Sequence, residues 1–136
     1  MEKKEIKRLD LALDPGSPIP IYEQIKARVK QAVLSGELRD GDQVTPIREL
    51  AAQLKVNPNT IVKVYYQLEV EGYLKAQLGS GIFVYRDPAK TAADQQEIFR
   101  RLTDEYVARA SGLGYSLGQM AEEIGRRRGG KGVKGT

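Results

Sequence analysis

The chain has 136 residues, 40% of them hydrophobic and 29% charged, which is the size of one domain with an appendage and the composition of a soluble globular protein. It contains neither cysteine nor histidine, which excludes disulfides, thiolate metal sites and every Ser-His or Cys-His catalytic arrangement. We therefore expect no enzyme, no cofactor and no metal site. No segment approaches the ~18 apolar residues of a membrane span, and the start lacks the apolar centre of a secretory signal, so we expect a cytoplasmic protein without membrane contact.

The first 17 residues are predicted to form an N-terminal arm containing a short strand. Leu9, Leu11 and Leu13 alternate with polar or small residues, which is the period of a half-buried strand. The turn-forming residues 14–17 end it. A helix is predicted behind Pro20, because apolar residues then recur in four-residue steps until Ser35 and Gly36 end the pattern. The stripe on this helix consists of Ile21, Ile25, Val29 and Val33, widened by Tyr22 and Ala32.

Two short helices are predicted next, separated only by Lys55 and Val56. Thr45 is expected to cap the first helix, with Pro46 at its first position, and Asn57 is expected to cap the second in front of Pro58. Two helices joined by so brief a turn form a helix-turn-helix. The apolar face of the first consists of Ile47, Leu50, Ala51 and Leu54, and that of the second consists of Ile61, Val64, Tyr65 and Leu68.

A two-stranded hairpin is predicted after the second helix ends at Gly72. Residues 73–76 and 82–85 have strand composition, and residues 77–81 between them are rich in glycine. A helix-turn-helix followed by a hairpin is the winged-helix plan, in which the second helix enters a major groove of DNA and the hairpin reaches the neighbouring backbone or minor groove. Residues 18–87 are therefore predicted to be a winged helix-turn-helix DNA-binding domain.

The candidate DNA-binding residues are polar side chains at helix starts and glycines at the hairpin tip, because amides, hydroxyls and free N–H groups suit base edges and phosphates. They are Arg48, Lys55, Asn57, Asn59, Thr60, Lys63, Tyr66, Gly79, Ser80 and Gly81. Other roles stay open for several of them. Asn57 is most simply a helix cap, Arg48 could pair with a carboxylate, and Lys63 with Tyr66 could form an ordinary solvated face. The two glycines are first of all turn residues.

Residues 88–125 are predicted to form two further helices. The first carries an apolar face from Thr91 to Gly112, and the second follows a capping box made by Ser116 and Gln119. So short a helical pair has little room for its own core, and we expect its apolar face to form a homodimer interface. Packing on the first helix of the same chain is the alternative. The candidate interface residues are Ile98, Phe99, Leu102, Tyr106, Leu117, Met120 and Ile124.

A basic tail is predicted at residues 126–136. It combines glycines with basic side chains and has no apolar face, so we expect it to be disordered, either as a solubilising tail or in weak contact with phosphates. Its basic residues are Arg126, Arg127, Arg128, Lys131 and Lys134. The whole chain is thus predicted to be mainly α with a small β-hairpin (α+β): a winged helix-turn-helix followed by a short two-helix extension.

The sequence from Ser35 to Val84, SGELRDGDQVTPIRELAAQLKVNPNTIVKVYYQLEVEGYLKAQLGSGIFV, resembles the DNA-binding domain of the GntR family of bacterial transcription regulators. The resemblance spans about residues 18–85. The segments PIYEQI at 20–25 and NPNT at 57–60, with the short C-terminal part, resemble the YtrA-like subfamily in particular. This resemblance implies that Arg48 contacts DNA, that Asn59 and Thr60 begin a recognition helix, and that Gly79 and Gly81 belong to the wing.

The sequence departs from the family pattern at three places. Val44-Thr45-Pro46 replaces the usual leucine-proline-serine, Lys55 stands where glycine is typical, and Pro58 stands where many relatives have a base-reading arginine. The recognised operator sequence therefore cannot be borrowed from other branches.

The expected function is that of a homodimeric, sequence-specific DNA-binding regulator, a repressor on a palindromic operator of double-stranded DNA. The subfamily resemblance implies control of operons that encode ABC-type transporters. No converging set of polar groups indicates an effector pocket, so the small-molecule effector stays unassigned. Two rivals are a winged-helix module for protein contacts without specific DNA binding and a carboxylate enzyme using Glu69 and Glu71.

Overall fold

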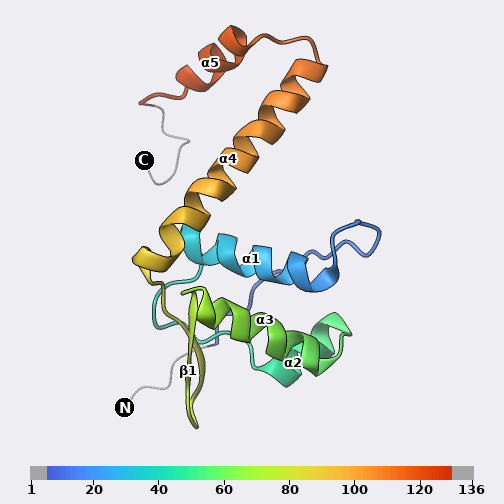
Figure 1. The fold of residues 1–136 in the computed structure, drawn as a ribbon, viewed down its shortest axis with the longest axis vertical. Coiled ribbons are helices and arrows are strands. Elements are labelled where there is room, and N and C mark those ends of the chain that lie inside the picture. The colour runs from blue at the N-terminus through green and yellow to red at the C-terminus, as the bar shows by residue number, and fades with distance from the viewer. Residues whose placement is uncertain (1–5, 130–136) are drawn as a thin grey trace. The chain divides into compact units, whose positions relative to one another are not determined.

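The structure, a computed structural model, describes residues 6–129. It contains five helices and one two-stranded antiparallel sheet in this range, so the predicted fold class is confirmed (Figure 1). The elements are α1 (Ile21–Ser35), α2 (Ile47–Leu54), α3 (Pro58–Val70), β1 (Leu74–Gln77), β2 (Gly81–Val84), α4 (Pro88–Gly112) and α5 (Leu117–Gly125). The chain divides into two compact units, residues 1–93 and 94–136.

The core of the first unit is made by α1, α2, α3 and the base of the hairpin. The predicted apolar stripes point inward: Ile25 and Ile61 have no exposed surface, and Leu68 is equally buried. α1 ends where Gly36 adopts a left-handed backbone with φ 87°, as its predicted end at Ser35-Gly36 requires. The apolar residues of this core are Ile25, Val29, Ala32, Val33, Leu38, Val44, Leu50, Ala51, Ile61, Val64, Tyr65, Leu68, Tyr73, Leu74 and Val84.

The start of α2 differs from the prediction. Pro46 is the N-cap residue rather than the first helical residue, and no side chain caps this helix. Thr45 is instead buried, and its carbonyl oxygen accepts a 2.7 Å hydrogen bond from the hydroxyl of Tyr65. The prediction that Thr45 caps α2 is therefore wrong, because the threonine faces the core and its backbone joins α3 to the turn before α2.

The hairpin pairs Leu74 with Val84 at its base and Gln77 with Gly81 at its tip, so each strand is shifted by about one residue from the predicted range. Gln43, in the segment before α2, forms a further antiparallel bridge to Phe83 of β2. The N–H of Val44 donates to the carbonyl oxygen of Ile82 at 3.0 Å. The hairpin is thus anchored at its base by the turn before α2, and it extends from the end of α3 (Figure 1).

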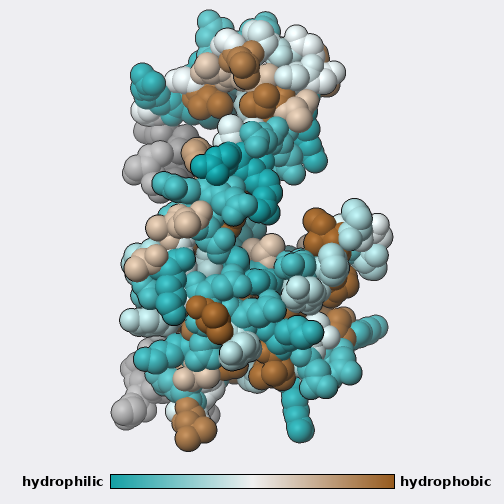
Figure 2. Space-filling model, viewed as in Figure 1, coloured by the Kyte–Doolittle hydropathy of each residue, from teal (hydrophilic) through white to brown (hydrophobic). Residues whose placement is uncertain are grey.

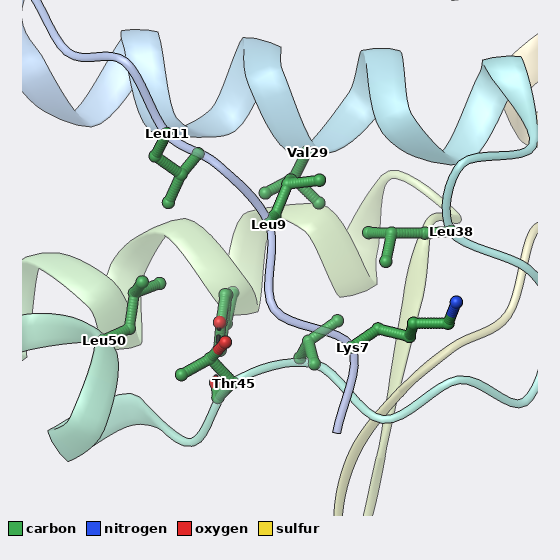
Figure 3. A pocket seen from close by; sticks show the side chains of 9 residues that line it. Lys7, Leu9, Leu11, Val29, Leu38, Thr45 and Leu50 are labelled. Atoms are coloured by element: carbon green, nitrogen blue, oxygen red, sulfur yellow. Dashed lines mark hydrogen bonds between the residues drawn. The ribbon is translucent and has the colours of Figure 1, made fainter. Parts of the chain in front are cut away.

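The N-terminal arm packs on the core without forming the predicted strand. Beyond an isolated bridge from Ile6 to Gln43, residues 7–13 have no ladder partner, so the alternating leucines mark an extended segment that is half-buried but unpaired. Figure 3 shows Leu9 and Leu11 beside the same small cavity of about 20 Å³ as Val29 of α1. Lys7 directs its amino group away from these leucines (Figure 3). The arm therefore completes the apolar core of the first unit.

The first turn of α4 is tied to the first unit. Asp87 caps it by accepting a 3.0 Å hydrogen bond from the N–H of Ala89, while its own N–H donates to the carbonyl oxygen of Gly72 at 2.8 Å. Gly72 has φ 91°, and a Cβ there would come within 2.7 Å of Lys90 Cβ. α4 begins at Pro88, three residues before the predicted start, because Asp87 supplies this cap.

The second unit contains the rest of α4 and the whole of α5. The predicted capping box is confirmed: Ser116 Oγ accepts from the N–H of Gln119, and the Gln119 side chain accepts from the N–H of Ser116. Met120 is buried, and it lines a hollow of about 420 Å³ together with Tyr106 and Tyr115. Residues 126–129 continue α5 as turns, while the predicted tail beyond them, with Lys131 and Lys134, lies outside the described residues.

Among residues 6–129, no helix is both long enough and apolar enough to span a bilayer. The same residues contain no group of three or more acidic side chains arranged to hold a metal ion.

Candidate nucleic-acid interface

The outward face of α3 carries the polar residues that the sequence singles out. Ile61, Val64, Tyr65 and Leu68 are buried on one side of the helix, as predicted. On the opposite side Asn59 and Lys63 are exposed, and Tyr66 is 65% exposed. Val62 and Val70 share this outward face. The helix therefore buries its apolar stripe and presents amide, amine and phenol groups to solvent.

The N-terminus of α3 is preorganised by Asn57. Its side-chain oxygen accepts a 2.8 Å hydrogen bond from the N–H of Asn59, which confirms the predicted cap. Pro58 occupies the first helical position, where its missing N–H costs nothing. Thr60 lies half-buried in this first turn. The first turn of an α-helix favours anions, so this end of α3 suits a phosphate or a base edge.

Arg48 is exposed on the first turn of α2. The adjacent Glu49 pairs with Arg8 of the N-terminal arm, whose guanidinium nitrogen lies 2.7 Å from the carboxylate. Within the described part of the chain Arg48 itself enters no ion pair, so the alternative that it merely neutralises a surface carboxylate has no support. No local sequence pattern indicates this pairing, because 41 residues separate Arg8 from Glu49.

Lys55 has an unusual backbone. It ends α2 with φ 57° and ψ 45°, and it is the one residue other than glycine with positive φ among residues 6–129. Its N–H donates to the carbonyl oxygens of Ala51 and Ala52 in the last turn of α2. This left-handed conformation explains why glycine is typical of the position in the family that the sequence resembles. The lysine side chain is exposed in the turn between the two helices.

The two wing glycines have different structural requirements. Gly79 has φ 77° in a turn closed by a 3.0 Å hydrogen bond from the N–H of Ser80 to the carbonyl oxygen of Gln77. Nothing lies within 4 Å of the place where its Cβ would stand. Gly81 has φ 127°, and a Cβ there would come within 2.6 Å of the side-chain nitrogen of Gln43. The absence of a Cβ at Gly81 thus lets the side chain of Gln43 pack closely against the wing. Gln43 is not among the residues predicted from the sequence to be functional.

The carboxylates proposed for a rival enzyme are engaged in structural contacts. Glu71 lies 2.6 Å from the amino groups of both Lys26 and Lys30 of α1, and Glu69 accepts a 3.3 Å hydrogen bond from the N–H of Ala76. Burial opposes ionisation of Glu71, but the hydrogen bonds from the two lysines outweigh it and lower its pKa. Glu71 therefore holds the end of α3 against α1, and no pair of carboxylates is poised for acid–base work here.

Tyr65 and Tyr66 are neighbours with opposite roles. Burial raises the pKa of Tyr65 well above its usual value, and the charge of Glu49 adds to this effect. Its hydroxyl is therefore a fixed donor to Thr45, whereas Tyr66 is exposed on the outward face of α3. The prediction that Tyr65 belongs to the core is confirmed.

In the second unit, most candidate interface residues are solvent-exposed in the single chain. Phe99 is 72% and Leu117 67% exposed, and Figure 2 shows apolar groups on the surface of α5 and the end of α4. Met120 is buried within its own unit and Ile98 is half-buried. The other exposed candidates are Leu102, Tyr106 and Ile124.

Together these features define a winged helix-turn-helix protein of the DNA-binding class: a short helix, a tight turn, a capped second helix with a polar outward face, and a glycine-tipped hairpin. Residues 21–84 match the family described as "Bacterial regulatory proteins, gntR family". The chain is 31% identical over 115 residues to the HTH-type transcriptional repressor YtrA of Bacillus subtilis, covering 84% of this chain and 88% of that protein.

Solved structures of regulators have the same fold. A GntR family transcriptional regulator from Listeria monocytogenes superposes with a TM-score of 0.64 at 27% identity, covering 84% of this chain and 98% of that one. YtrA from Sulfolobus acidocaldarius, a GntR-family transcription factor, gives a TM-score of 0.53 at 33% identity, covering 68% of this chain and 97% of that one. The present chain belongs to the GntR family.

It is accordingly a DNA-binding transcription regulator and not an enzyme, and the predicted resemblance to YtrA-like members is confirmed.

Proposed function

We propose that this regulator is a homodimeric repressor that reads a palindromic operator with the outward face of α3. The observation that carries this proposal is the outward face of α3, where Asn59, Lys63 and Tyr66 stand exposed behind a capped helix start. An exposed helix of this kind fits the major groove, and its polar side chains match the hydrogen-bonding edges of bases.

The contacts divide into two groups. Asn59, Thr60, Lys63 and Tyr66 lie on α3 and serve base recognition, because side chains of these types hydrogen-bond or pack against base edges. The other contacts position the domain on phosphates, since charged side chains and backbone N–H groups bind phosphate oxygens. They are Arg48, Lys55, Asn57 and the wing residues Gly79, Ser80 and Gly81.

The dimer forms through the exposed apolar face of α4 and α5. Phe99 and Leu102 leave more than half of their surface in water, as do Leu117 and Ile124. Within residues 94–129 only Met120 is buried, so this unit gains little from its own core. A second copy that covers this face removes apolar surface from water and brings a second reading helix to the other half of a palindrome.

Repression is supported by the name of the B. subtilis relative, a transcriptional repressor that matches most of this chain. The resemblance to YtrA-like regulators supports control of a transporter operon. Action on chromosomal DNA places the protein in the cytoplasm.

Selection of duplexes from a random pool by the purified chain, at two salt concentrations, tests this function. We expect enrichment of an inverted repeat, and Arg48→Ala is expected to weaken binding to it by about 1–3 kcal/mol if the guanidinium contacts a base. Sedimentation of the complex is expected to show two chains per duplex. Transcription from a promoter carrying the repeat is expected to fall when the protein is supplied.

Arg39→Ala is the matched control, because Arg39 is also exposed in the first unit but lies outside the predicted surface. Enrichment of no duplex at either salt concentration would instead favour a protein-contact module. Equal binding by the Arg48 and Arg39 variants would remove Arg48 from the interface.

A further inference from the structure

The most exposed large apolar side chain of the first unit lies at the tip of the wing. Leu78 has a relative exposure of 105%, whereas Tyr66, the next highest in this unit, reaches 65%. Gly79 follows with φ 77°, and the N–H of Ser80 closes the turn on Gln77. A positive φ at the third residue is the mark of a type II turn, which leaves Leu78 at the second position. Leu78 thus stands fully in water.

The turn that carries Leu78 is held by a firmly anchored base. Tyr73, Leu74 and Val84 are buried at the start and end of the hairpin. The N–H of Gly41 donates to the carbonyl oxygen of Val84, and the N–H of Val84 donates to that of Asp42, both at 2.8 Å. Closer to the tip, the side chain of Gln43 packs against Gly81. The leucine is therefore presented by an ordered hairpin.

The chemistry of the wing suits close approach to DNA. From Leu74 to Tyr85 the chain has no acidic residue, and its one charged side chain is Lys75, whose amino group lies 5.4 Å from the centre of the Tyr85 ring. Phosphates are therefore not repelled. Figure 2 shows apolar atoms at the lower end of the molecule, where Figure 1 draws the hairpin tip.

We propose that Leu78 inserts as an apolar wedge into the minor groove beside the half-site read by α3. The minor groove offers an apolar surface of sugar and base edges, and leucine is among the side chains that proteins insert there. Burial in the groove removes from water a side chain that gains nothing from its place in the free protein. The inference rests on the proposed operator binding and adds to it a contact with the flanking base pairs.

The test uses the full chain and a selected duplex whose flanks are A·T pairs, in three versions. Replacing the flanking A by 2,6-diaminopurine adds an amino group to the minor groove only. Replacing each flanking A·T pair by inosine·C keeps the minor groove free of that amino group and changes the major groove. We expect the diaminopurine flanks to weaken binding by the unchanged chain about tenfold, and the inosine flanks to leave it unaltered.

Leu78→Ser is expected to bind the A·T duplex about tenfold more weakly and to bind all three duplexes alike. Gln77→Ala, an exposed change at the same tip, is expected to keep the discrimination of the unchanged chain. Both variants are expected to melt at the same temperature as the unchanged chain, because neither side chain is buried.

Equal binding of the three duplexes by the unchanged chain would overturn the wedge, as would full affinity of Leu78→Ser for the A·T duplex. In both cases operator binding itself would stand. An unchanged chain that binds none of these duplexes would overturn the proposed function together with the wedge.

Discussion

The two units of the chain bury their apolar side chains to different extents. In the first, fifteen apolar residues from α1, α2, α3, the hairpin and the connecting segments are buried together. In the described part of the second, residues 94–129, Met120 alone is buried, although Phe99, Leu102 and Leu117 are as apolar as the residues of the first core. The first unit therefore buries an apolar core of its own, whereas the second leaves most of its apolar face uncovered, which is what the proposed dimer needs.

Separating the units gives the largest expected effect. A chain that ends at Ala93 is expected to keep a cooperative thermal transition, to sediment as a monomer, and to bind the palindrome about 100-fold more weakly, because the linkage between two half-sites is lost. Circular dichroism and sedimentation measure the first two properties, and a titration with the duplex measures the third. A dimeric fragment would show that the interface lies in the first unit.

Two identical substitutions compare the units directly. Leu68→Ala removes a side chain with no exposed surface and is expected to lower the free energy of unfolding by about 2–5 kcal/mol in urea. Leu102→Ala removes one that is 57% exposed. It is expected to leave unfolding of the first unit unchanged and to raise the dissociation constant of the dimer, measured by sedimentation. A loss of stability without a change in dimerisation would place Leu102 in an intramolecular core.

Acid titration compares two glutamates that each form ion pairs with two basic side chains. Glu71 joins α3 to α1, whereas Glu123 is half-buried and pairs with Arg126 and Arg127 of its own segment. The folded state lowers the pKa of Glu71, so its contribution to stability is complete above the ordinary value of 4.5 and is lost as the pH falls through the lowered pKa. In Glu71→Gln, the free energy of unfolding is expected to fall less steeply as the pH is lowered below 4.5.

Glu123→Gln serves as the control. Hydrogen bonding to Arg127 and the charge of Arg126 lower the pKa of Glu123, but all three side chains lie at the surface, where solvent screens these local pairs. We expect the stability of the first unit to keep its pH dependence in this variant. The same shallower pH dependence in both variants would contradict the assignment of acid sensitivity to the α1–α3 contact.

The smallest expected effect concerns the left-handed turn at Lys55. Lys55→Gly is expected to raise the free energy of unfolding by about 1 kcal/mol, because glycine adopts this backbone without strain. If the amine contacts a phosphate, the substitution is also expected to reduce by about one the slope of the logarithm of the DNA-binding constant against the logarithm of the salt concentration. Lys55→Ala keeps the strain and removes the charge, so it is expected to change the slope alone.

Local signals in the sequence predict several elements well. Asn57 with Pro58, and Ser116 with Gln119, mark helix starts because capping involves residues only two or three positions apart. The outward face of α3 follows from helical periodicity for the same reason. The division between α3's buried and exposed sides could therefore be predicted without the structure.

Contacts between distant segments could not be predicted in this way. The ion pair of Arg8 with Glu49, the bridges made by Gln43 and the two lysines on Glu71 depend on how segments pack, and no local pattern records them. The strand predicted for Leu9 to Leu13 is the opposite case. The alternation correctly indicates half-burial, but a strand also needs a ladder partner, and none lies beside these residues in the described chain.

The packing of the arm has a practical consequence for anyone who trims this protein. The family match begins at Ile21, yet Leu9 and Leu11 lie in front of that point and cover Val29, Leu38 and Leu50 (Figure 3). A fragment limited to the family match would expose those side chains to solvent. It would also remove Arg8, the ion-pair partner of Glu49, and so leave an unpaired carboxylate next to Arg48. Loss of solubility or of operator affinity in such a fragment would then reflect the cut rather than the intact regulator.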